Sequence, residues 1–199
     1  KAFASGADIS KFEEERSSDE DVSKYSEASK AFYDSVFHFP KPTIAMIQGY
    51  CIGGGMGMAV ACDIRLCEDK SRFAIPAAKL GLGYGYEGIR RLADLVGPAM
   101  VKEIFFTARQ FSADEAQQMG LVNRVLPPHM LAPYVDDYAK RISKNAPMTM
   151  ESVKAIVQAI QDDESARDLN ALDAMVKACF ASQDYIEGRR AFMEKRKPN

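Results

Sequence analysis

Four glycines at positions 53, 54, 55 and 57 form the segment of this chain that is best suited to chemistry. The preceding residues 42–47 are apolar and partly β-branched, which predicts a buried strand, and the small apolar residues 58–62 predict a buried helix. Glycine lets a ligand approach the backbone closely, and a helix start offers unpaired N–H groups at the positive end of its dipole. Such a turn can bind a phosphate or stabilise an oxygen that becomes negative during a reaction.

Three interpretations of these glycines compete. A dinucleotide fingerprint needs G-x-G-x-x-G with an acidic residue about 20 positions later. Counting from Gly53 or Gly55 places Met58 or Val60 at the third glycine, and the Gly-Lys-Ser/Thr of a P-loop is absent. A tight packing site without chemistry is the second interpretation, because glycine turns are common. The third, which we favour, is an oxyanion hole.

A second motif, Ser5-Gly6-Ala7-Asp8-Ile9, stands at the beginning of the chain. Together with the glycine segment it resembles the crotonase, or enoyl-CoA hydratase/isomerase, superfamily. The resemblance extends over essentially the whole chain through further motifs in the same order: Cys62-Asp63-Ile64-Arg65, Leu80-Gly81, Phe106-Thr107-Ala108, Ala113-Asp114-Glu115-Ala116, Gly120-Leu121-Val122-Asn123 and Phe192-Met193-Glu194-Lys195-Arg196.

The resemblance implies an α/β fold with a crotonase-like spiral core of β-β-α turns. We expect this core over residues 1–127, with its N-terminal part missing, because the chain opens inside a motif that should follow a strand. Pro127-Pro128 marks the boundary, after which the pattern is purely helical over residues 128–199. In the family such a C-terminal helical region packs subunits together, so the resemblance implies a trimer or a dimer of trimers.

The resemblance also implies an acyl-CoA substrate whose thioester oxygen accepts hydrogen bonds from two backbone N–H groups, those of Ala7 and Gly54 here. The residues expected to contact CoA are Ala4, Gly6, Ala7 and Ile9 in the first motif, and Phe192 and Lys195 in the last helix, with Lys195 directed toward phosphate. No separate cofactor is expected, since coenzyme A is part of the substrate.

Two positions depart from the family pattern. Hydratases of this family carry two glutamates, and the matching positions here are Gly57 and Ala77. A carboxylate must activate water in that reaction, so hydration by the two-carboxylate route is not expected.

Two other side chains are candidates for the chemistry. Tyr84 lies where the methylmalonyl-CoA decarboxylase branch carries a functional tyrosine, although that branch keeps a glutamate at the position of Gly57. Glu87 is a candidate base for isomerisation if burial raises its pKa. Tyr84 can equally be an aromatic packing residue, and Glu87 a charge at a helix start. A CoA-binding subunit without catalysis is the non-enzymatic alternative.

Composition excludes several function classes. The 199 residues carry a net charge of −2, which argues against nucleic-acid binding. No apolar run approaches 18 residues, so no membrane span is expected. The four cysteines form no C-x-x-C and the two histidines lie outside the motifs, so we expect no metal site, but buried thiols in a reducing, cytoplasmic setting.

Hydrophobic periodicity and capping signals give the remaining elements. Helices are expected from Asp8 to Arg16 and over residues 22–38, 54–61, 86–96, 98–108 and 112–119, and then over 129–144, 147–162, 165–180 and 184–196. Strands are expected over residues 43–48, 63–68, 72–75 and 121–126.

Overall fold

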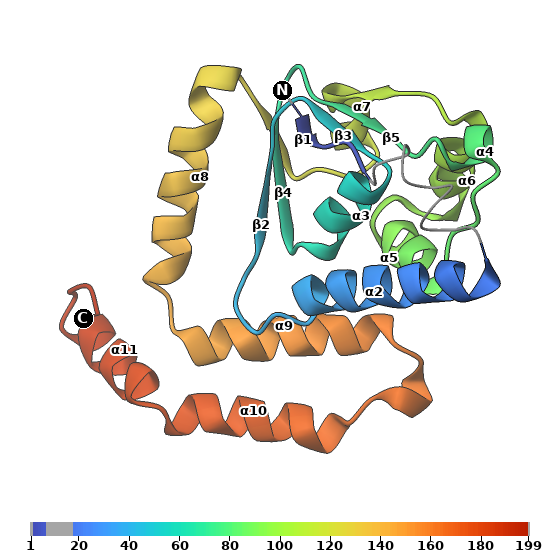
Figure 1. The fold of residues 1–199 in the computed structure, drawn as a ribbon. Helices are drawn as coiled ribbons and strands as arrows, with labels where there is room; N and C mark the ends of the chain where they lie inside the picture. The colour runs from blue at the N-terminus through green and yellow to red at the C-terminus, as the bar shows by residue number, and fades with distance from the viewer. Residues whose placement is uncertain (1, 7–17, 199) are drawn as a thin grey trace. The chain divides into compact units, whose positions relative to one another are not determined.

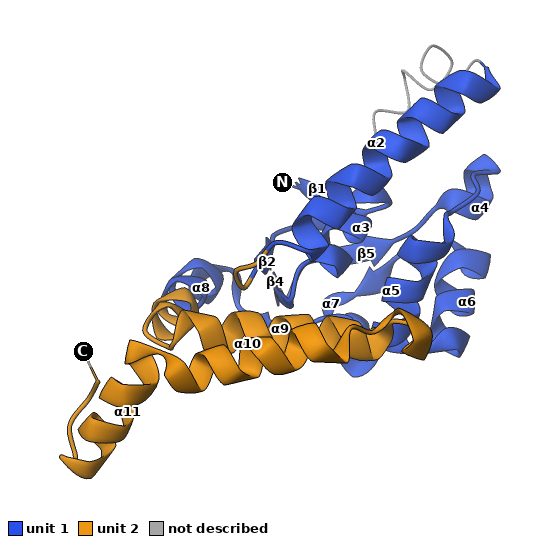
Figure 2. Ribbon diagram, turned by 90° about the horizontal axis from the view of Figure 1, so that it is seen from below, with its two compact units in different colours: residues 1–39, 43–136 blue, residues 40–42, 137–199 orange. Residues whose placement is uncertain are grey.

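The computed structural model describes residues 2–6 and 18–198. It divides into two compact units, residues 1–39 with 43–136 and residues 40–42 with 137–199 (Figure 2).

Within its described residues, the first unit contains two sheets. Strands β1 (Ala2–Ala4), β3 (Tyr50–Ile52), β5 (Arg72–Ala74) and β6 (Phe111–Ser112) form one sheet, in which only β6 is antiparallel to its neighbour. The other sheet is fully parallel, in the order β2 (Ile44–Ile47), β4 (Ile64–Glu68), β7 (Arg124–Leu126).

The connections between these strands follow a repeating β-β-α order. β2 and β3 lie in different sheets and lead into α3 (Gly54–Ala61), and β4 and β5 repeat this step before α4 (Ala77–Leu80) and α5 (Tyr86–Val96) (Figure 1). The α/β fold class with β-β-α turns, expected from the resemblance, is therefore confirmed.

The other helices of the first unit are α2 (Asp19–Phe37), α6 (Pro98–Thr107) and α7 (Ala113–Gln118). Helix α8 (Pro128–Ser143) contains the boundary between the units. The second unit holds α9 (Pro147–Gln161), the short 3₁₀ helix η2 (Glu164–Ala166), α10 (Leu169–Ala181) and α11 (Gln183–Met193). No helix in the described part of the chain is long and apolar enough to cross a membrane.

Local sequence signals explain most helix starts. The capping box of α7 is present: Ser112 accepts from the Glu115 N–H at 3.2 Å, and the Glu115 carboxylate accepts from the Ser112 N–H at 2.8 Å. Pro147 occupies the first turn of α9, as its missing N–H favours. Both signals can be read from the residues at the start of each helix.

Some boundaries differ from the expectation. The strand expected over residues 121–126 begins only at Arg124, and the helix expected from residue 165 begins at Leu169 because η2 precedes it. The strand β3 and the short helix α4 were not anticipated from periodicity. The helix expected from Asp8 to Arg16 lies outside the described residues.

A single apolar core fills the first unit between the sheets and the helices α3, α5 and α6. Its largest side chains are almost fully inaccessible, and each contributes about 1.5–3 kcal/mol by leaving water; they include Ile47, Met56, Phe73, Leu92, Ile104 and Phe111.

One buried cation joins two of the sequence motifs. Arg65 is 4% exposed, and its guanidinium donates to the Leu121 carbonyl at 2.7 Å and the Cys62 carbonyl at 2.6 Å. The Arg65 N–H donates to the Asn123 side chain at 2.8 Å, and the Asn123 N–H returns a bond to the Arg65 carbonyl at 2.9 Å. Burial lowers the pKa of Arg65, against smaller opposing contributions from Cys62 and Asp63. The Leu121 and Val122 N–H groups donate to the Ala116 carbonyl at 2.9 and 3.2 Å. Together with the bonds to Arg65, they hold residues 121–123 outside the ladder, which accounts for the late start of β7.

Replacing Arg65 with methionine tests the structural role of these hydrogen bonds. Arg65→Met leaves buried carbonyl groups without donors, so we expect a loss of about 2–4 kcal/mol in the free energy of unfolding. Arg124→Met, at an exposed position of β7, serves as the control and should cost less than about 0.5 kcal/mol. Urea unfolding measures both, and equal losses would contradict a structural role for Arg65.

Candidate active site

The glycine turn connects the end of β3 to the start of α3. Gly53 has φ +56°, a conformation that favours glycine, and its N–H donates to the Ala74 carbonyl at 2.8 Å. Its carbonyl accepts from Met56 at 3.0 Å and Gly57 at 3.1 Å. Helix α3 has no side-chain cap, and within the described residues no group accepts from the Gly54 N–H. The turn therefore presents a backbone donor at a helix start.

The end of β1 lies directly against this turn. A Cβ atom built on Gly55 would lie 2.3 Å from the Ala4 carbonyl oxygen, and one built on Gly6 would lie 3.2 Å from the Gly54 nitrogen. Gly6 also has φ +87°. The two backbones thus approach more closely than side chains allow, and β1, β3 and α3 gather around this contact (Figure 1).

The structure brings five of the sequence-predicted residues into one cleft of the first unit, with a volume of about 1070 Å³. Ala4 and Gly6 come from the end of β1, Gly54 from the turn, and Tyr84 from the loop before α5, while Glu87 lies in the first turn of α5 and also lines the cleft. Ala7 and Ile9 lie outside the described residues, so their predicted contacts stay predictions.

Tyr84 and Glu87 stand in different surroundings. The Tyr84 hydroxyl lies 4.0 Å from the position of a Cβ atom on Gly53, and its ring packs edge-on against Phe105 at 5.0 Å between centroids. The Glu87 carboxylate accepts from Arg90 at 2.9 and 3.1 Å, and its side chain is 39% exposed. Tyr84 is thus close to the turn, whereas Glu87 is held in a solvent-accessible ion pair.

The two positions without carboxylates differ in their surroundings: Ala77 is buried, whereas Gly57 is partly exposed and lines the cleft. Ala77 is 3% exposed and belongs to the core. A Cβ atom on Gly57 would lie 3.2 Å from Cζ of Tyr33, so the ring of that tyrosine stands beside the helix at this point.

Three residues of the cleft were missed by the sequence analysis: Tyr33, Asp34 and Arg91. The Tyr33 hydroxyl donates to the Gly54 carbonyl at 3.2 Å, and burial, with a smaller contribution from Tyr25, raises the Tyr33 pKa. The spacing of Tyr25, Ser29 and Tyr33 would have placed them on one face of α2.

Asp34 and Arg91 connect α2 to α5. Arg91 donates to Asp34 at 2.6 Å and stacks over Phe37 at 4.1 Å. Burial alone would raise the Asp34 pKa, but hydrogen bonds from Lys30 and Arg91 outweigh it, so the pKa lies below its ordinary value. Asp34 is therefore ionised at neutral pH and compensates the buried Arg91.

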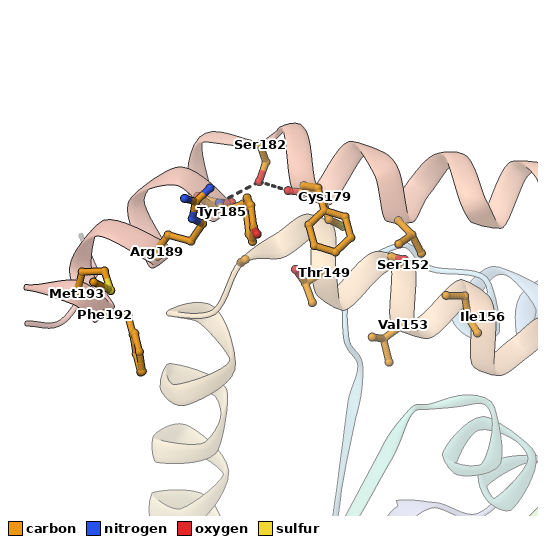
Figure 3. A pocket seen from close by; sticks show the side chains of 15 residues that line it. Thr149, Ser152, Val153, Ile156, Cys179, Ser182, Tyr185, Arg189, Phe192 and Met193 are labelled. Carbon is orange, nitrogen blue, oxygen red and sulfur yellow. Dashed lines mark hydrogen bonds between the residues drawn. The ribbon is translucent and has the colours of Figure 1, made fainter. Parts of the chain in front are cut away.

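The second unit contains a separate pocket of about 850 Å³, formed by α9, α10 and α11 (Figure 3). Ser182, the N-cap of α11, donates to the Cys179 carbonyl and accepts from the Tyr185 N–H. Phe192 lines this pocket and is 82% exposed. Lys195 follows α11 with φ +54°. Their predicted contacts with CoA stay predictions.

Two cysteines of the first unit, Cys51 and Cys67, are buried thiols. Burial raises the pKa of Cys51 and of Cys67 to about 12, with nearby acidic groups and thiols adding to the effect. Among the described residues, no group of three or more His, Cys, Asp or Glu side chains is arranged to hold a metal ion.

Comparison with known proteins decides the family. The chain matches the enoyl-CoA hydratase/isomerase family over residues 1–199. The chain belongs to this family. It is therefore an enzyme of the crotonase superfamily, as the motifs predicted.

Individual relatives agree with this assignment. The chain is 35% identical over 199 residues to the crotonyl-CoA hydratase of Syntrophomonas wolfei. The aligned region covers 100% of the chain and 76% of that relative. It is 34% identical to the carnitinyl-CoA dehydratase of Salmonella arizonae, with the same coverage. A solved structure described as an enoyl-CoA hydratase/carnithine racemase from Magnetospirillum magneticum superposes with a TM-score of 0.91 at 35% identity, covering 100% of the chain and 74% of that structure.

The contact of Gly55 with Ala4 predicts a large effect of one methyl group. Gly55→Ala should lower the free energy of unfolding by about 1–3 kcal/mol or more, because the overlap is with backbone atoms that cannot rotate away. The matched control is Gly83→Ala, where a Cβ atom would meet no atom within 4 Å. Thermal unfolding of both variants checks the prediction, and a neutral Gly55→Ala would contradict the close approach.

Thiol labelling provides a second prediction. Because the thiolate is the reactive form, Cys51 and Cys67 should not react with a chromogenic disulfide reagent at pH 8 in the folded protein. Cys62 and Cys179, which are partly exposed, should react first, and unfolding in urea should release the remaining two. Labelling of Cys51 or Cys67 at the rate of a free thiol would show that this core opens readily.

Proposed function

We propose that this protein acts on an acyl-CoA thioester and stabilises its enolate with backbone N–H groups at the glycine turn. The observation that carries the proposal is the Gly54 N–H at the start of α3, which has no acceptor among the described residues, with the Ala4–Gly6 segment packed against it. The names of the relatives, a crotonyl-CoA hydratase and a carnitinyl-CoA dehydratase, support a CoA thioester as the substrate class.

The Gly54 N–H and the Ala7 N–H are the proposed donors. Donors aimed at an oxygen that gains negative charge are worth roughly 3–4 kcal/mol each in comparable sites. Both are backbone groups, so they remain available where side chains have changed.

The residues at positions 57 and 77 decide which reaction is proposed. Gly57 and Ala77 cannot activate water or deliver a proton, so we do not expect hydration by two carboxylates. A route to the enolate that needs no base agrees better with this cleft.

Decarboxylation is such a route. In a malonyl-type acyl-CoA, the bond between the α-carbon and the carboxylate breaks, CO2 leaves, and the electron pair forms the thioester enolate. A proton from water then adds to the α-carbon and gives the saturated acyl-CoA. In this proposal the Tyr84 O–H orients the departing carboxylate, which its position near Gly53 allows.

Isomerisation with Glu87 as the base is the second candidate. Glu87 lines the cleft and carries a carboxylate, which that reaction needs. Its ion pair with Arg90 restrains the side chain, so we place this candidate behind decarboxylation.

The proposal includes the binding of CoA and the assembly of the protein. Phe192 and Lys195 are the proposed contacts of the CoA moiety, and no further cofactor is required. Exposed apolar side chains of the second unit, including Phe180, Phe192 and Met193, support self-association into a trimer or a dimer of trimers. We also propose a cytoplasmic location, on the ground of the family to which the chain belongs.

A substrate panel tests the reaction. We expect turnover of methylmalonyl-CoA or ethylmalonyl-CoA with release of CO2, and hydration of crotonyl-CoA slower by about 10²-fold or more. Tyr84→Phe should reduce decarboxylation by about tenfold, as for the loss of a hydrogen bond to a charged group. Tyr50→Phe is the matched control, because Tyr50 is 49% exposed on β3, outside the cleft.

The other outcomes identify the alternatives. Fast crotonyl-CoA hydration that survives Tyr84→Phe and Glu87→Gln would contradict this account of the site. Isomerisation of an enoyl-CoA that Glu87→Gln abolishes would make Glu87 the base. Binding of CoA thioesters without turnover of any of them would support the non-catalytic CoA-binding subunit.

A further inference from the structure

Tyr33 and residue 57 compete for the same space. A Cβ atom on Gly57 would lie 3.2 Å from Cζ, 3.3 Å from Cε1 and 3.4 Å from the hydroxyl oxygen of Tyr33. Contacts this short with one ring require the ring to shift. Gly57 is therefore a glycine next to a tyrosine, at the position where the family resemblance places a hydratase glutamate.

The ring of Tyr33 is not a freely rotating end. Its hydroxyl donates to the Gly54 carbonyl at 3.2 Å, and Phe32 packs edge-on against it at 5.4 Å between centroids. The next residue, Asp34, accepts from Arg91 at 2.6 Å, and Arg91 is 8% exposed. These contacts fix this part of α2 beside α3 and α5.

We infer that Tyr33 replaces the side chain missing at position 57: its ring fills that space and its hydroxyl holds the peptide of Gly54. The hydrogen bond reaches the carbonyl of the Gly54–Gly55 peptide, which adjoins the Gly53–Gly54 peptide with the proposed donor N–H. Tyr33 is thus a positioning residue. The inference rests on the proposed function, because only then does the Gly54 N–H face a reacting oxygen.

The packing of Tyr33 against α3 accounts both for the glycine at position 57 and for the tyrosine in the cleft. A Cβ atom at position 57 would lie 3.2–3.4 Å from three atoms of the Tyr33 side chain, so a side chain at position 57 requires that ring to move. A polar hydroxyl that lines the cleft then stands where a carboxylate would otherwise stand. The Tyr33 phenol is neutral at neutral pH, and burial raises its pKa further, so the cleft has a hydroxyl here instead of a base.

A thermal-unfolding cycle tests the shared space without any substrate. Gly57→Ala should lower Tm in the protein with Tyr33, but should raise Tm in the Tyr33→Ala background, because alanine favours the helix once the ring is gone. Gly88→Ala in α5, where a Cβ atom would meet no atom within 4 Å, is the control and should change Tm equally in both backgrounds. Tyr33→Leu serves as the background if Tyr33→Ala does not fold. An equal effect of Gly57→Ala in both backgrounds would overturn the inference.

The role in positioning Gly54 is tested by Tyr33→Phe, which removes only the hydroxyl. We expect kcat for the best acyl-CoA substrate to fall about fivefold, as for one ordinary hydrogen bond, while KM stays within about twofold and Tm is nearly unchanged. An unchanged kcat, or a fall in kcat that only follows a large loss of Tm, would overturn the positioning role. If the wild-type protein turns over no CoA thioester, the proposed function fails, while the unfolding cycle still decides whether Tyr33 and residue 57 share one space.

Discussion

The structure depends on one close contact, in which the backbone of Ala4–Gly6 packs onto the backbone of Gly53–Gly55. The distance of 2.3 Å between a Cβ atom on Gly55 and the Ala4 carbonyl excludes any side chain there. This contact joins the end of β1 to the start of α3 and leaves the N–H of Gly54 without a partner among the described residues. The cleft, the sheet and the proposed donor all require these two segments to touch, which makes glycine necessary for geometric reasons before any chemistry is considered.

The glycines of the turn serve different physical purposes. Gly53 provides a positive φ, Gly55 allows the backbone of Ala4 to approach, and Gly57 leaves room for the ring of Tyr33. Other family motifs are structural rather than chemical. The Arg65 segment and the Asn123 segment bind each other through buried and partly buried hydrogen bonds, and Asp63 accepts two bonds from Thr43, at 2.7 and 2.9 Å. A motif that several family members share therefore need not mark a residue that touches the substrate.

The resemblance to the family predicted the fold class and the cleft residues Gly54, Tyr84 and Glu87. Glycine spacing, proline positions and capping signals, which act over a few residues, predicted most helices. The sequence did not predict β3, whose three residues are too few for a periodic pattern. Nor did it predict Tyr33, which lies 24 positions before Gly57 and meets it only because α2 packs against α3. The Asp34–Arg91 ion pair joins residues 57 positions apart and depends equally on tertiary structure.

The central claim is that the glycine turn polarises a thioester carbonyl although both expected carboxylates are absent. Isotope-edited infrared spectroscopy tests this most directly, using a CoA thioester labelled with ¹³C at its carbonyl and lacking a group that the enzyme can remove. The account predicts that the carbonyl band of the bound thioester moves to lower frequency than that of the free thioester, because donors at the turn weaken the C=O bond. A bound thioester whose carbonyl band stays at its free frequency would contradict it.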